Sequence, residues 1–168
     1  MSIAVASGIL FTNIFNSMVI AAATDSNLPD SVVAGREYFR FVNPGDFFKI
    51  FSPASQVLTL FSLILFWKDF RNVRLLLGIA LLCFVASDIL AFTYFHPRTE
   101  VMFSGSMPDT ATLKRLSSEW STMNWFRSFI VLIGVLLSFL AVDKIYASKQ
   151  GSRKSRRLRK TFSDSKFL

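Results

Sequence analysis

Four long apolar stretches constrain the fold of this chain more than any other feature. A helix of about 20 apolar residues crosses the roughly 30 Å hydrocarbon core of a bilayer, because each residue advances it by about 1.5 Å. Asp88 and Arg127 are the charged residues inside these stretches, which cover residues 3–23, 51–67, 75–95 and 126–142. The sequence therefore predicts an all-α fold, a bundle of four transmembrane helices.

The chain is long enough for one domain, and its net charge is concentrated at one end. Of its 168 residues, 52% are apolar, and the formal net charge is +8. Residues 1–143 contain ten basic and ten acidic residues, whereas residues 144–168 contain nine basic residues and one acidic residue, Asp164. We therefore expect a transmembrane domain at 1–147 and a basic, disordered cytoplasmic tail at 148–168.

The cysteine and histidine content excludes several classes of membrane enzyme. Cys83 is the one cysteine, so a single chain has no disulfide, no two-cysteine redox centre and no thiolate metal site. His96 is the one histidine, so one subunit cannot ligate a haem through two histidines. The sequence therefore predicts neither a metal site nor a cofactor.

The first apolar stretch is expected to stay in the protein as a helix and not to be removed as a signal peptide. The three alanines at 21–23 resemble a cleavage site. However, no basic residue precedes the stretch, and Asn13 and Asn16 interrupt it. Both features are unusual for a signal peptide.

Basic residues predict the orientation of the four helices in the membrane. The short connection at 68–74 carries three basic residues and the C-terminal tail carries nine. By the positive-inside rule both lie in the cytoplasm, so both termini are cytoplasmic and the longer connections at 24–50 and 96–125 lie outside. We therefore expect an integral protein of a bacterial inner or plasma membrane.

The two outer connections are expected to contain short helices. Asp30 or Ser31 is a suitable N-cap for a helix that runs through Val42, and Asn43-Pro44 would stop or kink the chain before the second span. In the second connection, a helix is expected to begin at residue 109 or 110. No proline interrupts residues 110–142, so this helix should continue straight into the fourth span.

Polar side chains from all four helices are predicted to lie in one layer of the membrane. Counted from the cytoplasmic boundaries at about 1.5 Å per residue, Gln56 lies about 18 Å deep, Asp88 about 21 Å and Arg127 about 25 Å. By the same count, Asn13 and Asn16 lie at roughly 15–20 Å. These depths place the layer in the outer half of the bilayer.

The fourth helix presents a polar face at this layer. Trp120, Asn124 and Arg127 have the spacing i, i+4, i+7 and so share one side of a helix. Burying the Asp88 carboxylate costs free energy unless a partner compensates its charge. Arg127 lies at a matching depth, so we expect the two side chains to be within direct or water-bridged reach.

Two interpretations of this layer are open. In the first, its polar groups only hold the helices together by hydrogen bonds, as Ser, Thr, Asn and Gln do in many membrane proteins. In the second, the layer is the base of a pocket for a small hydrophobic or aromatic molecule. The candidate ligand-binding residues of that pocket are Asn13, Asn16, Gln56, Trp120 and Asn124.

His96 and the basic tail also have two readings each. His96 lies at the outer end of the third helix, where a histidine is either a polar helix terminus or an acid or base at the mouth of a pocket. The basic run at 153–160 looks like a nucleic-acid patch in isolation. On a membrane-bound tail we expect it to attract anionic lipids instead, at about 1 kcal/mol per basic residue, and we expect no nucleic-acid partner.

The polar face of the last span resembles that of the anthrone oxygenase-like family of small four-helix membrane proteins, a domain-of-unknown-function family. Trp120, Asn124 and Arg127 carry the resemblance, and Asn43-Pro44 and Asn13 add to it. The pattern covers about residues 1–143. Residues 97–99 read Pro-Arg-Thr where the family has Pro-x-Asn. The resemblance implies a cofactor-independent oxygenase of polycyclic aromatic compounds.

In such a reaction, a base removes a proton from the substrate and leaves an electron-rich carbanion that reacts with oxygen. The candidate catalytic residues are Asp88 or His96 as the base, with Arg127 or Asn124 stabilising the oxyanion. The main alternative function is a non-enzymatic accessory or structural subunit of a membrane complex, whose polar layer binds its own helices or those of a partner protein. A transporter is a weaker alternative, because the sequence shows no inverted repeat.

Overall fold

The computed structural model describes residues 2–67, 71–103 and 106–164, with side chains up to Gln150. In this part of the chain all regular structure is helical, including two short π-helices, η1 and η2. The elements in chain order are α1 (Ser2–Phe15), η1 (Asn16–Ile20), α2 (Ala21–Asp25), α3 (Asp30–Tyr38), α4 (Pro44–Leu65), α5 (Arg71–Leu90), η2 (Ala91–Phe95), α6 (His96–Phe103) and α7 (Thr110–Asp164).

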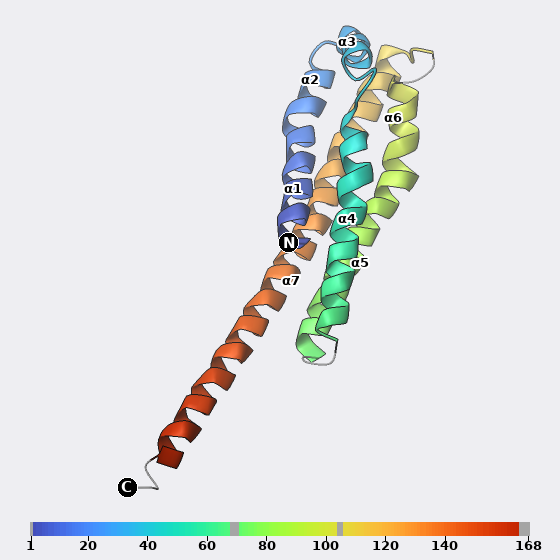
Figure 1. The fold of residues 1–168 in the computed structure, drawn as a ribbon. Coiled ribbons are helices and arrows are strands. Elements are labelled where there is room, and N and C mark those ends of the chain that lie inside the picture. The colour runs from blue at the N-terminus through green and yellow to red at the C-terminus, as the bar shows by residue number, and fades with distance from the viewer. Residues whose placement is uncertain (1, 68–70, 104–105, 165–168) are drawn as a thin grey trace.

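Four continuous helical segments are long and apolar enough to cross a membrane, as the sequence predicts. They are Ser2–Asp25, Pro44–Leu65, Arg71–Phe103 and Thr110–Gln150. They run alternately up and down, with α7 packed on both α1 and α5 and α4 packed on both α1 and α5 (Figure 1). We call the end where α3 lies the cap end, and the end where α4 stops and α5 starts the hairpin end.

The helices extend beyond the apolar stretches that predict them. The second begins at Pro44 and not near residue 51, because the Asn43 side chain accepts a hydrogen bond from the Gly45 N–H while the Asp46 carboxylate accepts one from the Asn43 N–H. This reciprocal capping box satisfies N–H groups that a helix start leaves free, and proline is well suited to the first helical turn. Helix α3 is correspondingly shorter than expected and ends at Tyr38.

The tail departs most from the sequence-based expectation. Residues 148–164 are predicted to be disordered, but their backbone continues α7 without a break to Asp164, and this part of α7 projects beyond the bundle (Figure 1). Lysine and arginine are good helix formers and no proline intervenes, so an established helix can propagate through them. The side chains of the basic run at 153–160, and residues 68–70 of the basic connection, lie outside the described part.

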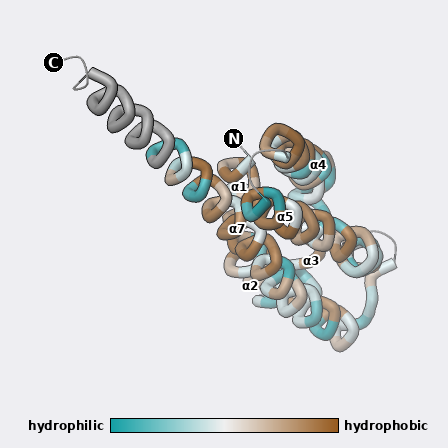
Figure 2. The backbone as a smooth tube through the Cα atoms, turned by 90° about the horizontal axis from the view of Figure 1, so that it is seen from below, coloured by the Kyte–Doolittle hydropathy of each residue, from teal (hydrophilic) through white to brown (hydrophobic). Residues whose placement is uncertain are grey.

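Three buried apolar clusters stabilise the bundle at successive levels, and Figure 2 shows the apolar character of the packed helices. At the cap end, α3 is fixed to α6 and α7 through Val32, Met102, Leu113 and Leu116. The middle cluster joins α1, α5 and α7 through Ala6, Ile9, Leu10, Ala80, Phe84, Val131 and Val135. At the hairpin end, α4, α5 and α7 meet through Leu63, Val73, Leu77, Ala141 and Ile145.

Candidate functional site

A group of polar side chains lies between the cap cluster and the middle cluster. On α7 these side chains fall between Leu116 of the cap cluster and Val131 of the middle cluster. We call this group the polar layer; its members are Asn13, Ser17, Gln56, Ser87, Asp88, Asn124 and Arg127. All come from helices that are candidate membrane spans, so polar atoms here have little access to water.

Arg127 and Asp88 form the charged centre of the layer. The Arg127 Nη2 atom lies 4.0 Å from the Asp88 Oδ1 atom, and the two side chains are 5% and 20% exposed. The contact predicted from their matching depth is therefore confirmed. At this separation the pair is ionic without a hydrogen bond, since charge-assisted bonds are usually about 2.7–2.9 Å long.

Two further polar groups fix the charged pair in place. Gln56 on α4 donates a hydrogen bond of 2.6 Å from its Nε2 atom to the Asp88 Oδ2 atom. The Arg127 Nε–H group donates to the Ser87 hydroxyl at 3.0 Å. Gln56 is a residue that the depth count places in the layer, whereas Ser87 is not singled out by the sequence although it precedes Asp88.

Aromatic rings surround the Arg127 guanidinium. Its central carbon lies 4.6 Å from the Phe48 ring centroid and 5.7 Å from that of Phe95. Phe95 in turn meets Trp120 edge to face, with ring centroids 5.7 Å apart. The Phe48 and Phe95 rings therefore both lie within cation–π distance of the guanidinium group. The sequence-based site does not include Phe48, because Phe48 precedes the second apolar stretch. It does not include Ser87 either.

A second, uncharged part of the layer joins α1 to α7. The Asn124 Nδ2 group donates to the backbone carbonyl of Asn13 at 2.8 Å and to the Ser17 hydroxyl at 2.7 Å. Asn13 is fully buried, Asn124 is 1% exposed and Ser17 is 6% exposed. The prediction that Asn13 and Asn124 lie at one level is confirmed. Ser17 follows Asn13 by four residues, so helical spacing is the signal that could have found it.

Three buried polar atoms of the layer have no hydrogen-bond partner. They are the Nδ2 and Oδ1 atoms of Asn13 and the Nη2 atom of Arg127. A buried polar group without a partner costs about 1–3 kcal/mol, and more if it is charged. Buried groups of this kind are normally satisfied by protein, ordered water or a ligand. The three atoms are therefore two donors and one acceptor whose hydrogen bonds the layer itself does not satisfy.

Both π-helices lie beside the layer. Element η1 starts at Asn16, next to Ser17, and η2 starts at Ala91, less than one turn after Asp88. A π-helix inserts a residue into the normal helical repeat, is rare, and occurs mainly at functional sites. The sequence does not predict either π-helix, because residue composition alone does not distinguish a π-helix from an α-helix.

The small polar residues of α4 differ from the polar layer in their hydrogen bonding. Ser55, Thr59 and Ser62 donate to carbonyl groups three or four residues earlier in α4 itself. Such bonds leave the hydroxyl satisfied within its own helix. Thr59 is buried, so this face packs closely, and the hydroxyl groups of these three residues bond within α4.

Three predicted site residues are not part of the hydrogen-bonded layer. Trp120 contacts the Phe95 ring edge to face. His96 projects outward, with its side chain 69% exposed and its Nδ1 atom 3.9 Å from a Glu100 carboxylate oxygen. Asn16 is 5% exposed and begins η1. His96 lies within the continuous helical segment Arg71–Phe103 and not at its end, because α6 follows η2 directly. Of the two candidate bases, Asp88 is the one that lies in the polar layer.

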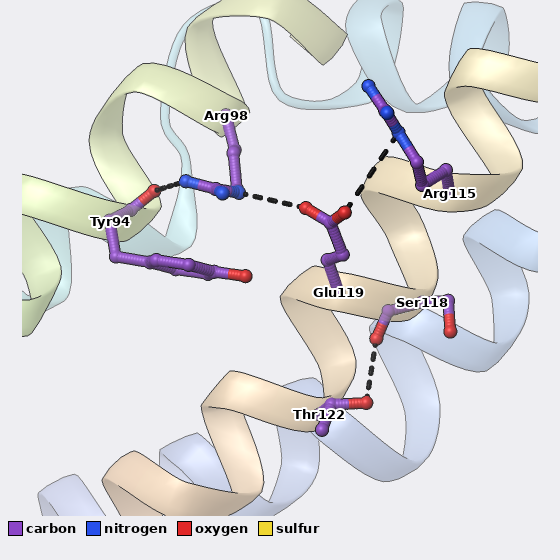
Figure 3. Close-up of polar contacts among 6 residues, drawn as sticks. All are labelled: Tyr94, Arg98, Arg115, Ser118, Glu119 and Thr122. Atoms are coloured by element: carbon purple, nitrogen blue, oxygen red, sulfur yellow. Dashed lines mark hydrogen bonds and ion pairs between the residues drawn. The ribbon is translucent and has the colours of Figure 1, made fainter.

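An ion-pair cluster lies nearer the cap end, about 12 Å from Arg127 along α7 by helical rise. Glu119 lies between Arg98 on α6, at 3.3 Å, and Arg115 on α7, at 3.9 Å (Figure 3). The Arg98 guanidinium covers the Tyr94 ring at 3.6 Å and donates to the Tyr94 carbonyl (Figure 3). The cluster joins α6 to α7 directly above the Phe95–Trp120 contact.

An open depression is present on the surface where α3 meets α4. It has a volume of about 490 Å³ and is lined by Tyr38, Phe39, Phe41, Val42, Asn43 and Pro44. None of the polar-layer residues lines it. Across the described residues, no three His, Cys, Asp or Glu side chains gather closely enough to hold a metal ion.

Comparisons of the chain with protein-family models, with curated proteins and with solved structures give no match. The polar layer offers a buried cation with an unbonded Nη2 group, a carboxylate that can accept a proton, and an unpaired carboxamide, next to aromatic rings. Such an arrangement can orient a small polar group on an otherwise apolar molecule.

Proposed function

We propose that this is an integral membrane protein that binds a small hydrophobic, aromatic molecule at the polar layer. The observation that carries the proposal is the set of unpaired buried atoms on Asn13 and Arg127. A layer that only held helices together would be expected to satisfy its own polar atoms, because the membrane interior supplies no water to do so. A guest with an oxygen atom would satisfy them.

The guest would be held by its polar group at the layer and by its rings among aromatic side chains. Arg127 would donate from Nη2, and the Asn13 carboxamide would exchange hydrogen bonds with a hydroxyl or carbonyl group. A planar guest would take the place of the Phe48 or Phe95 ring against the guanidinium, where stacking is favourable. The π-helix η2 supports Phe95 and is the segment whose adjustment would admit the guest.

The more specific form of the proposal is the cofactor-independent oxygenase that the family resemblance implies. Asp88 would remove a proton from the bound aromatic substrate, and Arg127 and Asn124 would stabilise the negative charge that develops on its oxygen. The resulting carbanion would react with molecular oxygen. Turnover of anthrone or a quinol under oxygen, lost in Asp88→Asn, is the expected result; equal rates in the wild type and this variant would contradict the enzymatic form.

We further propose that both termini are cytoplasmic and that the basic end of α7 contacts anionic lipid. Reporter domains fused after Asp109 and after Lys149 should then report opposite sides of the membrane. Fusions that report the same side would contradict this topology. Removal of residues 151–168 should weaken partition of the protein into anionic lipid domains without changing its four spans.

Binding is tested with 9-anthracenemethanol, a neutral aromatic alcohol whose fluorescence reports transfer into a protein site. Purified protein in nanodiscs of zwitterionic lipid should bind it saturably, and empty nanodiscs should not. Asn13→Leu should weaken binding about tenfold, the equivalent of one or two lost hydrogen bonds. Ser138→Ala is the matched control, because Ser138 is buried on α7 but bonds to the Gly134 carbonyl of its own helix.

Absence of saturable binding by the wild type would contradict the proposal. Co-purification with one stoichiometric membrane-protein partner, together with absence of binding, would favour the accessory-subunit alternative. Equal affinity in the wild type and Asn13→Leu would show that the guest binds outside the polar layer.

A further inference from the structure

We propose that the polar layer takes weakly acidic guests as anions, and that each guest binds together with one proton that Asp88 receives. This inference rests on the proposed function and adds to it the class of guest and the charge balance of binding. The guest class is an apolar molecule with one carboxylic acid or similarly acidic hydroxyl group.

A gap that is too wide for a hydrogen bond separates Arg127 from Asp88. The Nη2 atom has no hydrogen bond, and its nearest carboxylate oxygen is 4.0 Å away. The Arg127 Nε–H group is already bonded to Ser87, and the Phe48 and Phe95 ring centroids lie 4.6 Å and 5.7 Å from the guanidinium carbon. The unbonded Nη2 edge is therefore the position where an oxyanion fits, since guanidinium groups pair with carboxylates in their own plane.

The two oxygen atoms of the Asp88 carboxylate have different partners. Its Oδ2 atom is held by Gln56 at 2.6 Å, and its Oδ1 atom is the one that faces Arg127. If an anionic guest pairs with Nη2, Oδ1 loses its counter-ion while it stays half-buried. An isolated charge is costly at this depth, and a carboxylate can avoid the cost by taking up a proton.

In the polar layer, Arg127 supplies the charge that faces Asp88. Gln56 faces it from α4, Ser87 precedes it on α5, and Arg127 is the charged group that faces it from α7. The segment Ser2–Ile20, which contributes α1 and η1, carries no charged residue. Glu119 lies two turns away on α7 and is engaged by Arg98 and Arg115, and His96 points outward. The polar layer therefore contains one cation, Arg127, and one anion, Asp88, and its net charge is zero.

Charge and protons balance in the resulting exchange. A neutral acid enters the layer and its O–H bond breaks. The proton passes to Asp88 Oδ1, which forms a new O–H bond, and the guest oxyanion pairs with Arg127 Nη2. The layer holds one cation and one anion before and after, so a guest that is ionised in water must bring one proton with it. Binding is then electrically neutral overall.

The test compares two guests of the same ring system, anthracene-9-carboxylate and 9-anthracenemethanol, in wild-type nanodiscs of zwitterionic lipid. The carboxylate is ionised in water across pH 6–8. Its affinity should therefore fall about tenfold for each unit of pH, and titration calorimetry in buffers of different ionisation enthalpy should show uptake of about one proton. The alcohol should show neither effect.

Two variants sharpen the test. Asp88→Asn keeps the shape of the side chain without the charge, so the carboxylate should bind with no pH dependence and at least tenfold more tightly at pH 8. Arg127→Gln should weaken the carboxylate at least tenfold more than the alcohol. Arg127→Lys, which keeps the charge without the planar edge, should recover only part of the carboxylate affinity.

The outcomes separate the two proposals. If neither guest binds to any folded variant, the proposed function is wrong. If the alcohol binds at the layer but the carboxylate binds without proton uptake or is excluded, the function stands and the inference of proton-coupled anion binding is overturned. Carboxylate binding to Asp88→Asn that is no tighter than to wild type at pH 8 would overturn it too.

Discussion

The cap half and the hairpin half of the bundle are both built from apolar helices but differ in the hydrogen bonding of their buried polar atoms. In the hairpin half, α4, α5 and α7 meet through aliphatic side chains, and the buried Ser138 hydroxyl bonds to its own helix. In the cap half, Asn13, Asn124 and Arg127 are buried and Asp88 is half-buried, and three polar atoms of Asn13 and Arg127 have no partner. Both π-helices also lie in the cap half.

This difference is the support for placing the proposed binding site in the cap half. Aliphatic packing with internally bonded hydroxyl groups is sufficient to hold transmembrane helices together, as the hairpin half shows. The buried charges and unpaired polar groups of the cap half raise the free energy of the folded protein, and they bring no matching gain in packing. Such a cost is expected at a binding site and not at a structural contact.

The largest effect is expected from separating the charged pair. Arg127→Gln leaves Asp88 half-buried without its counter-ion and should lower the free energy of unfolding by about 3–5 kcal/mol. The double variant with Asp88→Asn should lose less, because no uncompensated charge remains. Equilibrium unfolding in mixed micelles measures both. Losses that simply add would show that the two side chains act independently.

This pair also shows how far the sequence alone could lead. Helical rise placed Gln56, Asp88 and Arg127 at one depth, and the structure brings them into contact. The rise fixes depth but not rotation, so the partners Ser87 and Phe48 could not be chosen from it. Likewise, hydropathy located the four spans but not their ends, because helices continue past the apolar core wherever capping groups such as Asn43 and Asp109 satisfy the backbone.

The next effect is expected from a cavity in the hairpin half. Leu77 is 4% exposed and lies in the aliphatic cluster between α4, α5 and α7. Leu77→Ala should lower the free energy of unfolding by about 2–4 kcal/mol through lost packing contacts. The same micelle assay measures it, and binding of 9-anthracenemethanol should not change. If Leu77→Ala weakened the binding of 9-anthracenemethanol as much as Asn13→Leu does, the two halves would not differ in their role in binding.

A smaller effect is expected at the boundary between the halves, where α7 approaches α5. A Cβ atom at Gly134 would lie 2.6 Å from the Phe84 Cε1 atom, so Gly134→Ala forces the Phe84 ring to move. We expect a loss of about 1–3 kcal/mol. Gly78→Ala is the control, because a Cβ atom there meets nothing within 4 Å. Equal stability of the two variants would mean that the α5–α7 contact is looser than described.

The smallest effect is expected at the cap end outside the spans, from the start of α7. The Asp109 carboxylate accepts a hydrogen bond from the Thr112 N–H at 3.1 Å, and its hydrogen bonds with Thr112 lower the pKa of Asp109. A lowered pKa means that the contribution is complete above the ordinary aspartate pKa and is lost as the pH falls through the lowered value, below about pH 4.

Hydrogen exchange at residues 110–113, measured relative to the intrinsic exchange rate at each pH, should therefore accelerate at low pH in the wild type. Asp109→Asn keeps a capping oxygen without a titrating group, so the acceleration should be absent. Acceleration of the same size in both proteins would assign the effect to another carboxylate.

The most direct test of the account is an experimental structure of the protein in a lipid nanodisc, determined with 9-anthracenemethanol present and again without it. The account predicts ordered non-protein density within hydrogen-bond distance of Arg127 Nη2 and the Asn13 carboxamide, and displacement of the Phe95 ring when the alcohol is bound. A polar layer in which the protein itself satisfies both groups, unchanged by the alcohol, would contradict it.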